Sequence, residues 1–86
     1  MDAPGPKRYR LNPEAAYLRD IGYVFIDLRG RIFRMNEAEF HALRVCCATG
    51  MEASQHRPFG DLLVECDSAT EVNASFTHQE VPSHDL

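Results

Sequence analysis

The sequence predicts a small α+β domain in which a β-hairpin runs directly into a helix. Residues 23–28 are rich in β-branched and aromatic side chains that alternate between two faces, as in a half-buried strand. Residues 36–49 begin with a helix-capping Asn and continue with apolar side chains at helical spacing. A chain of 86 residues holds one domain with one modest core.

The two ends of the chain differ in composition from the middle. Residues 1–8 contain Pro4, Gly5 and Pro6, which deny them regular structure, so we expect a flexible N-terminal segment. Residues 77–86 are polar and acidic, and we expect a flexible tail there. The folded domain is predicted to span residues 9–76.

Residues 9–20 carry conflicting signals. Asn12 and Pro13 are typical of the start of a helix, with Asn12 as its cap. The same stretch also reads as an extended strand. We expect the extended form, because the hairpin that follows is marginal in water without a further strand.

The hairpin is the clearest element. Val24, Ile26 and Leu28 share one face of the first strand, and Tyr23, Phe25 and Asp27 share the other. Arg29-Gly30 is predicted to be a two-residue turn, with Gly30 adopting positive φ. Residues 31–35 then form the return strand.

A helix is predicted over residues 37–49. Asn36 is a favoured cap, and Glu39 stands where a capping-box carboxylate reaches back to the cap. Met35 and Phe40 occupy the hydrophobic-staple positions, and Gly50 stops the helix. Its inward stripe is expected to comprise Phe40, Leu43 and either Cys46 or Cys47.

Two weaker elements follow. A second helix is predicted after Pro58, because an apolar face recurs at i, i+3, i+4 and i+7, formed by Phe59, Leu62, Leu63 and Cys66. Gly60 weakens this helix. Residues 72–76 alternate in a way that permits a short strand, with Val72, Ala74 and Phe76 on one side.

Charge distribution excludes some partners. The net charge is −4, and all nine Lys and Arg lie at or before Arg57, whereas residues 58–86 carry acidic groups only. Overall acidity argues against binding nucleic acid, which needs clustered cations. No stretch resembles a signal peptide or a membrane span, so we expect no membrane partner and a cytoplasmic protein with reduced thiols.

No constellation points to catalysis or a metal. The candidate zinc ligands are Cys46, Cys47, Cys66, His41 and His56, but adjacent cysteines rarely share one tetrahedral centre. We expect the thiols to pack as small hydrophobes. No nucleophile has a base and an orienting group beside it, and no Gly-rich phosphate loop occurs. We therefore predict no enzyme, no catalytic residue, no metal and no cofactor.

The return strand is the candidate binding element. Little sequence remains to cover its outer edge, and an open edge presents unpaired N–H and C=O groups that can accept an extended peptide as an added strand. Arg31 and Arg34 either discourage self-aggregation or meet carboxylates on that peptide. The candidate peptide-binding residues are Arg31, Ile32, Phe33, Arg34 and Met35.

The stretch from Asp20 to Gly50 resembles the PqqD-like family, the RiPP recognition elements. The matching pieces are a short strand and Gly, a hydrophobic strand, a tight turn near Gly, a strand ending in Leu-Asn (here Met35-Asn36), and a helix. The resemblance implies a winged-helix-like fold, with an N-terminal three-stranded antiparallel sheet followed by two or three helices.

The resemblance also implies a function. Family members bind the leader of a ribosomally made precursor peptide and present it to a peptide-modifying enzyme or a leader protease. The leader adds to the third strand, which corresponds to Arg31–Met35, and lies against the third helix. That helix should fall within residues 68–81, where this sequence is a poor helix former.

We therefore expect a non-catalytic peptide-binding adaptor. A winged-helix DNA-binding protein or transcription cofactor is an alternative, although residues 37–49 carry only one basic residue, Arg44. A third alternative is a small structural subunit that docks to a larger enzyme through Tyr23, Phe25 or the C-terminal segment.

Overall fold

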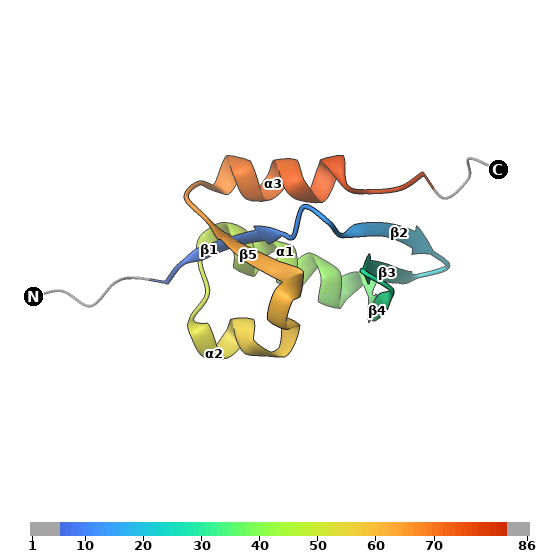
Figure 1. Ribbon diagram of the computed structural model, residues 1–86, viewed down its shortest axis with the longest axis horizontal. Helices are drawn as coiled ribbons and strands as arrows, with labels where there is room; N and C mark the ends of the chain where they lie inside the picture. Colours follow the sequence, from blue (N-terminus) through green and yellow to red (C-terminus); the bar gives the residue numbers. More distant parts are fainter. Residues whose placement is uncertain (1–5, 83–86) are drawn as a thin grey trace, which may run out of the picture.

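The computed structural model describes residues 6–82 as two small antiparallel sheets combined with helices (Figure 1). β2, β3 and β4 form one sheet in that order, and β1 pairs with β5 in the other. Helices α3 and α2 lie on opposite sides of the layer that holds β1, β5 and α1. In chain order the elements are β1 (Arg8–Leu11), β2 (Ala16–Asp20), β3 (Tyr23–Leu28), β4 (Arg31–Asn36), α1 (Glu37–Thr49), α2 (Ala53–His56), the 3-10 helix η1 (Arg57–Leu62), β5 (Leu63–Cys66) and α3 (Ala69–His78).

The predicted hairpin is confirmed as β3 and β4. Their register pairs Leu28 with Arg31 across the Arg29-Gly30 turn, in which both residues have positive φ (54° and 85°). Such a turn matches the twist of the flanking strands. The carboxylate of Asp27 accepts a hydrogen bond from the Gly30 N–H at 3.0 Å and so stabilises the turn.

The capped helix is confirmed as α1. The Asn36 side chain accepts from the Glu39 N–H at 2.7 Å, and the Glu39 carboxylate accepts from the Asn36 N–H at 2.9 Å. These two bonds form the predicted capping box. At the other end the Gly50 N–H donates to the carbonyl of Cys46 at 2.8 Å. The buried stripe of α1 comprises Phe40, Leu43 and Cys47.

Residues 9–20 are extended, as predicted, but form two strands rather than one. Asn12 separates them: its side chain accepts from the Glu14 N–H at 2.9 Å and donates to the carbonyl of Asp61 at 2.8 Å. Asn12 therefore closes a local turn and joins it to η1, instead of capping a helix.

The helix predicted over residues 59–66 is wrong. η1 contains Gly60 with φ 52° and ψ −123°, a backbone conformation outside any helix, and the chain continues as β5. Leu62 and Leu63 are both buried, so their spacing resembled a helical face. Strand β5 exists because β1 supplies a partner along its whole length, which local pattern does not reveal.

The strand predicted over residues 72–76 is also wrong, because α3 covers this segment. Ser68 caps the helix by accepting from the Glu71 N–H at 3.1 Å. The buried residues are Val72, Ser75 and Phe76, which have helical spacing. Packing against α1 and β1 overrides the modest helix propensity here. A third helix therefore does occupy most of residues 68–81, where the resemblance implied one.

The described parts of both predicted flexible ends form backbone hydrogen bonds with the rest of the domain. Lys7 exchanges two backbone hydrogen bonds with Met51, and Arg8 belongs to β1. At the other end, Tyr17 in β2 bonds to Gln79 and Val81 through its backbone at 3.0 and 2.6 Å. Residues 77 and 78 belong to α3, so the regular structure extends past residue 76. Residues 1–5 and 83–86 lie outside the described part of the chain.

Three aromatic rings join the sheet to the helices. Tyr17 from β2 and Phe76 from α3 both pack on Phe40 of α1, with ring centroids 4.9 and 5.5 Å from its own. The Tyr17 hydroxyl donates to the buried carbonyl of Phe76. Burial raises the pKa of the Tyr17 hydroxyl to about 12. The predicted α+β class is confirmed, whereas the second sheet was not predicted.

The helices in the described range are all too short or too polar to span a bilayer.

We predict that Ile21→Asn stabilises the protein. Ile21 sits in the β2–β3 turn with φ 49° and its side chain 90% exposed. A β-branched residue is disfavoured in this left-handed region, whereas Asn tolerates it. The free energy of unfolding should rise by about 1 kcal/mol, measured by urea denaturation. Ile32→Asn is the control, because Ile32 is also exposed but lies in a strand; an equal loss of stability in both variants would contradict the turn geometry.

Candidate functional site

Strand β4 forms one edge of the three-stranded sheet. Its inner side pairs with β3 along all six residues. Within residues 6–82, no other strand pairs with its outer side. The opposite edge, β2, is partly covered, because Tyr17 forms a parallel bridge with Glu80. In the described part of the chain, the sheet therefore has one open edge, which is that of β4.

The β3–β4 register determines which backbone groups that edge presents. In a two-residue hairpin, the pair that closes the turn exchanges both of its hydrogen bonds, and the pattern then alternates along the ladder. Starting from the closing pair Leu28 and Arg31, the groups of Phe33 and Met35 also point to β3. Those of Ile32 and Arg34 point outward. Two N–H and two C=O groups are therefore available on the open edge.

The helix cap ends this edge at Asn36. The Asn36 N–H also lies on the outward side by alternation, but the Glu39 carboxylate accepts its hydrogen bond. An added strand can therefore pair along Ile32 and Arg34 and meets helix α1 immediately beyond them. The capping box limits the length of the pairing and fixes its position.

The five predicted site residues alternate between the faces of the sheet. Phe33 and Met35 are half-buried and pack against the core, whereas Ile32, on the outer face, is 61% exposed. The Arg34 guanidinium lies over the Tyr23 ring at 5.3 Å, and that of Arg31 lies over Phe33 at 5.2 Å. Neither arginine forms an ion pair within the described residues.

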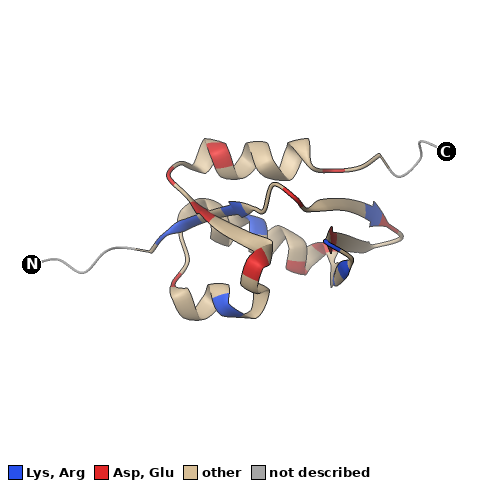
Figure 2. Cartoon of the chain, in the orientation of Figure 1, with Lys and Arg blue, Asp and Glu red and all other residues tan. Residues whose placement is uncertain are grey.

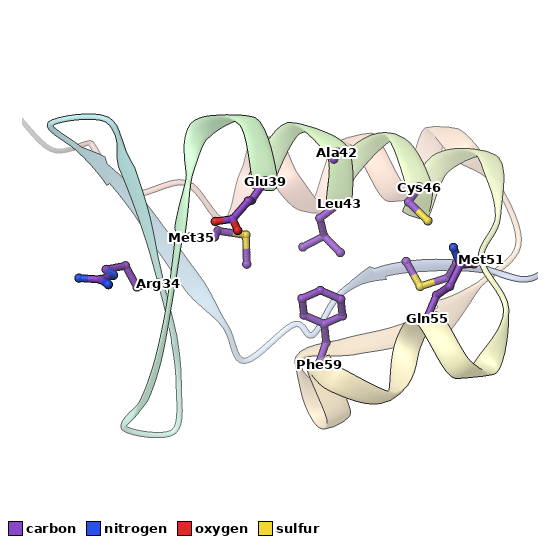
Figure 3. A pocket seen from close by; sticks show the side chains of 9 residues that line it. All are labelled: Arg34, Met35, Glu39, Ala42, Leu43, Cys46, Met51, Gln55 and Phe59. Atoms are coloured by element: carbon purple, nitrogen blue, oxygen red, sulfur yellow. The ribbon is translucent and has the colours of Figure 1, made fainter.

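An apolar hollow adjoins β4 on the inward side of the sheet. It has a volume of 480 Å³ and lies between α1 on one side and α2 and η1 on the other (Figure 3). In this view Met35 and Leu43 point into the hollow, whereas Arg34 points to the opposite side of its strand. The lining residues are Arg34, Met35, Glu39, Ala42, Leu43, Cys46, Met51, Gln55 and Phe59.

Sequence reasoning identified the edge but missed the hollow. Leu43 and Cys46 were assigned to the inward stripe of α1, and Phe59 to a helix that does not exist. Their meeting depends on the path of residues 50–59, which returns η1 beneath α1. Gly50 and Gly60, both with positive φ, mark turns of that path, but no local signal shows where the path leads.

The position of α3 corrects one expectation drawn from the resemblance. A third helix was expected to form a wall of the groove beside the binding strand. Helix α3 instead packs against α1 and β1, and the residues after it run along β2 at the opposite edge of the sheet. The walls beside β4 are α1 and η1.

Basic residues do not gather on one helix face. Figure 2 shows Lys and Arg spread over β1, β2, the β3–β4 hairpin and η1. Helix α1 contains Arg44 as its only basic residue, and α3 contains no Lys or Arg. The described helices therefore lack the basic recognition surface that duplex DNA binding needs.

The candidate metal ligands are dispersed. Cys46, Cys47 and Cys66 are free thiols, and Cys47 is fully buried in the core. The His56 ring stacks on Tyr9 with centroids 4.3 Å apart. Over residues 6–82, no three His, Cys, Asp or Glu side chains gather as a metal site would require.

We predict that iodoacetamide distinguishes the adjacent thiols. Burial raises the pKa of Cys47 to about 12, whereas Cys46 lines the open hollow. At pH 8 the native protein should alkylate at Cys46 at least about tenfold faster than at Cys47, as measured by tandem mass spectrometry. In urea both thiols should react. Equal native rates would contradict the placement of Cys47 in the core.

The site is thus defined by the residues themselves: the outward backbone groups of Ile32 and Arg34, and the hollow beside Met35. No family model, curated protein or solved structure matches the chain.

Proposed function

We propose that the protein is a non-catalytic cytoplasmic adaptor that binds an extended peptide by strand addition to β4. In this proposal the guest is the leader region of a ribosomally synthesised precursor peptide. The adaptor presents it to a maturation enzyme, either a peptide-modifying enzyme or a leader protease. Peptide capture by an open sheet edge is an established mode of recognition.

The observation that carries the proposal is the pair of unpaired backbone residues on β4. Ile32 and Arg34 together direct two donors and two acceptors away from β3. Each hydrogen bond formed to a guest contributes about 0.5–1.5 kcal/mol net. Because these bonds involve only main-chain atoms, they provide affinity for any extended peptide. Selectivity must then come from the side chains around the edge.

The rest of the molecule favours one guest at one edge. Residues 79–81 run along β2, where Arg19 also holds Glu80 in an ion pair at 3.0 Å. The β4 edge carries Arg31 and Arg34, and like charges on an edge disfavour pairing between two copies of the chain. The edge is therefore open to a foreign strand yet protected from self-association.

The resemblance to PqqD-like proteins supports a leader peptide as the guest. The hairpin, its turn and the capped helix carry the resemblance, and each forms as the pattern expects. A helix also occupies residues 69–78, within the segment where the resemblance places one. The expected contact between the guest and that helix is replaced, in the proposal, by contact with α1 and η1.

An adaptor also needs a surface for its enzyme, and the outer face of the sheet suits this role. Tyr23 and Ile32 are exposed there, together with Val81 from the C-terminal segment. A shallow hollow of 260 Å³ on this face is lined mainly by apolar side chains. This face meets the edge only along β4, so an enzyme that docks on its β2 side, beside Val81, leaves the edge free for a guest. The exposed apolar side chains on this face favour docking to a larger enzyme as a second role of the same adaptor.

We predict that Ile32→Pro weakens peptide binding without unfolding the protein. Proline removes the outward N–H of residue 32 but leaves the β3–β4 ladder intact, because that N–H faces solvent. Loss of one main-chain hydrogen bond should weaken binding by about 2–10-fold. Titration of 15N-labelled protein with synthetic leaders from short precursor genes beside its own gene gives the affinity.

Two variants control this experiment. Ile32→Ala keeps the N–H and should bind about as tightly as the wild type. Phe33→Pro removes a ladder hydrogen bond to β3 and should destabilise the strand by at least about 1–3 kcal/mol. A folded Ile32→Pro protein that binds like the wild type would refute strand addition. If the Ile32→Pro protein does not fold, the wild type provides the test. Strand addition would then be refuted if the amide signals of residues 31–35 do not move when the peptide binds.

A further inference from the structure

The hollow beside β4 lies on the side of the sheet toward which an added strand would point half of its side chains. Met35 belongs to the inward face of the sheet and also lines the hollow. Side chains of neighbouring strands at the same level point to the same face, and successive residues of one strand alternate. A guest strand on β4 therefore directs every second side chain toward the hollow.

The chemistry of the hollow suits large apolar side chains. Its floor consists of Leu43, Phe59 and the sulfur-containing residues Met35, Cys46 and Met51. Methionine adapts its shape to different apolar partners, so several kinds of side chain fit. The volume of 480 Å³ lies within the range of small-ligand sites, about 300–1,000 Å³.

Apart from Arg34, whose side chain points away, the polar residues that line the hollow already have partners. The Glu39 carboxylate accepts from the Asn36 N–H at 2.9 Å, and the Gln55 side-chain oxygen accepts from the Glu52 N–H at 2.8 Å. Both residues cap helices with these bonds. The hollow therefore offers little to a charged guest residue, whose burial without a partner is costly.

The outward face of the sheet instead favours an acidic guest residue. Arg34 lies on that face, packs on the Tyr23 ring and has no carboxylate partner among residues 6–82. A guest residue beside Arg34 also points outward, and an Asp or Glu there would complete an ion pair. The two neighbours of that guest residue point inward, beside Phe33 and Met35, which are both half-buried and apolar.

We propose that the β4 edge selects peptides with an apolar–acidic–apolar triplet, with the acidic residue beside Arg34 and an apolar neighbour in the hollow. The inference rests on the proposed strand addition and names the guest that it selects. The triplet reads the same in both directions, so it holds for a parallel or an antiparallel guest.

The test compares two synthetic peptides of identical composition. Both are eleven-residue hosts of Thr and Ser; one carries Leu-Glu-Leu at its centre and the other Leu-Leu-Glu. In the first, both Leu face inward while Glu meets Arg34. In the second, only one Leu can face inward while Glu remains outward, so affinity should fall about tenfold. Titration of 15N-labelled protein measures both.

Matched protein variants locate the two contacts. Ala42→Glu places a carboxylate in the hollow and should weaken Leu-Glu-Leu binding about tenfold or more, whereas Ala38→Glu lies on the same helix outside the hollow and should not. Arg34→Glu should weaken binding of the Leu-Glu-Leu peptide about two- to fivefold. The Arg34→Glu variant should regain this affinity for a peptide that carries Leu-Lys-Leu instead. Bound peptide should also slow alkylation of Cys46.

Failure of the inference differs from failure of strand addition. Suppose that both peptides bind the wild type equally, that Ile32→Pro weakens both equally and that Ala42→Glu changes the affinity of neither. The edge then binds peptides without this selectivity, and the inference is wrong. If binding is insensitive to Ile32→Pro, or the amides of residues 31–35 do not move, strand addition itself is wrong. Weaker binding of Leu-Leu-Glu together with sensitivity to Ala42→Glu supports both.

Discussion

The arrangement of the binding edge depends on β4, a strand that pairs on one side only among residues 6–82. Alternation of hydrogen-bond direction in an antiparallel ladder commits Phe33 and Met35 to β3 and leaves Ile32 and Arg34 facing outward. Both ends of this strand are fixed. The Arg29-Gly30 turn sets the register at one end, and the Asn36 capping box stops the strand at the other. A shift of one residue would exchange the outward and inward sets.

The same strand connects the edge to the hollow. Because α1 begins where β4 ends, the inward side chain of Met35 lies beside the first turns of the helix. The aromatic cluster of Tyr17, Phe40 and Phe76 holds the adjacent face of α1 against β2 and α3. Helix α1 therefore has one face in the core, while another borders the hollow. The arrangement places main-chain and side-chain recognition next to each other.

Sequence could predict the parts that local chemistry determines. The hairpin, its turn and the capped helix each depend on residues within a few positions of one another, and all three were predicted with their bounds within about one residue. β5 and α3 were misassigned because their partners are distant: β5 pairs with β1, and α3 is stabilised by packing on α1. The hollow was missed for the same reason, since Phe59 reaches it only through the path of residues 50–59.

Hydrogen exchange of the β4 amides tests the central claim most directly. In the free protein, the account predicts rapid exchange at Ile32 and Arg34 and slow exchange at Phe33 and Met35, because only the latter pair donates to β3. A bound peptide should slow the first two and leave the second two unchanged. Protected Ile32 and Arg34 amides in the free monomer, or unprotected ones in the complex, would contradict it.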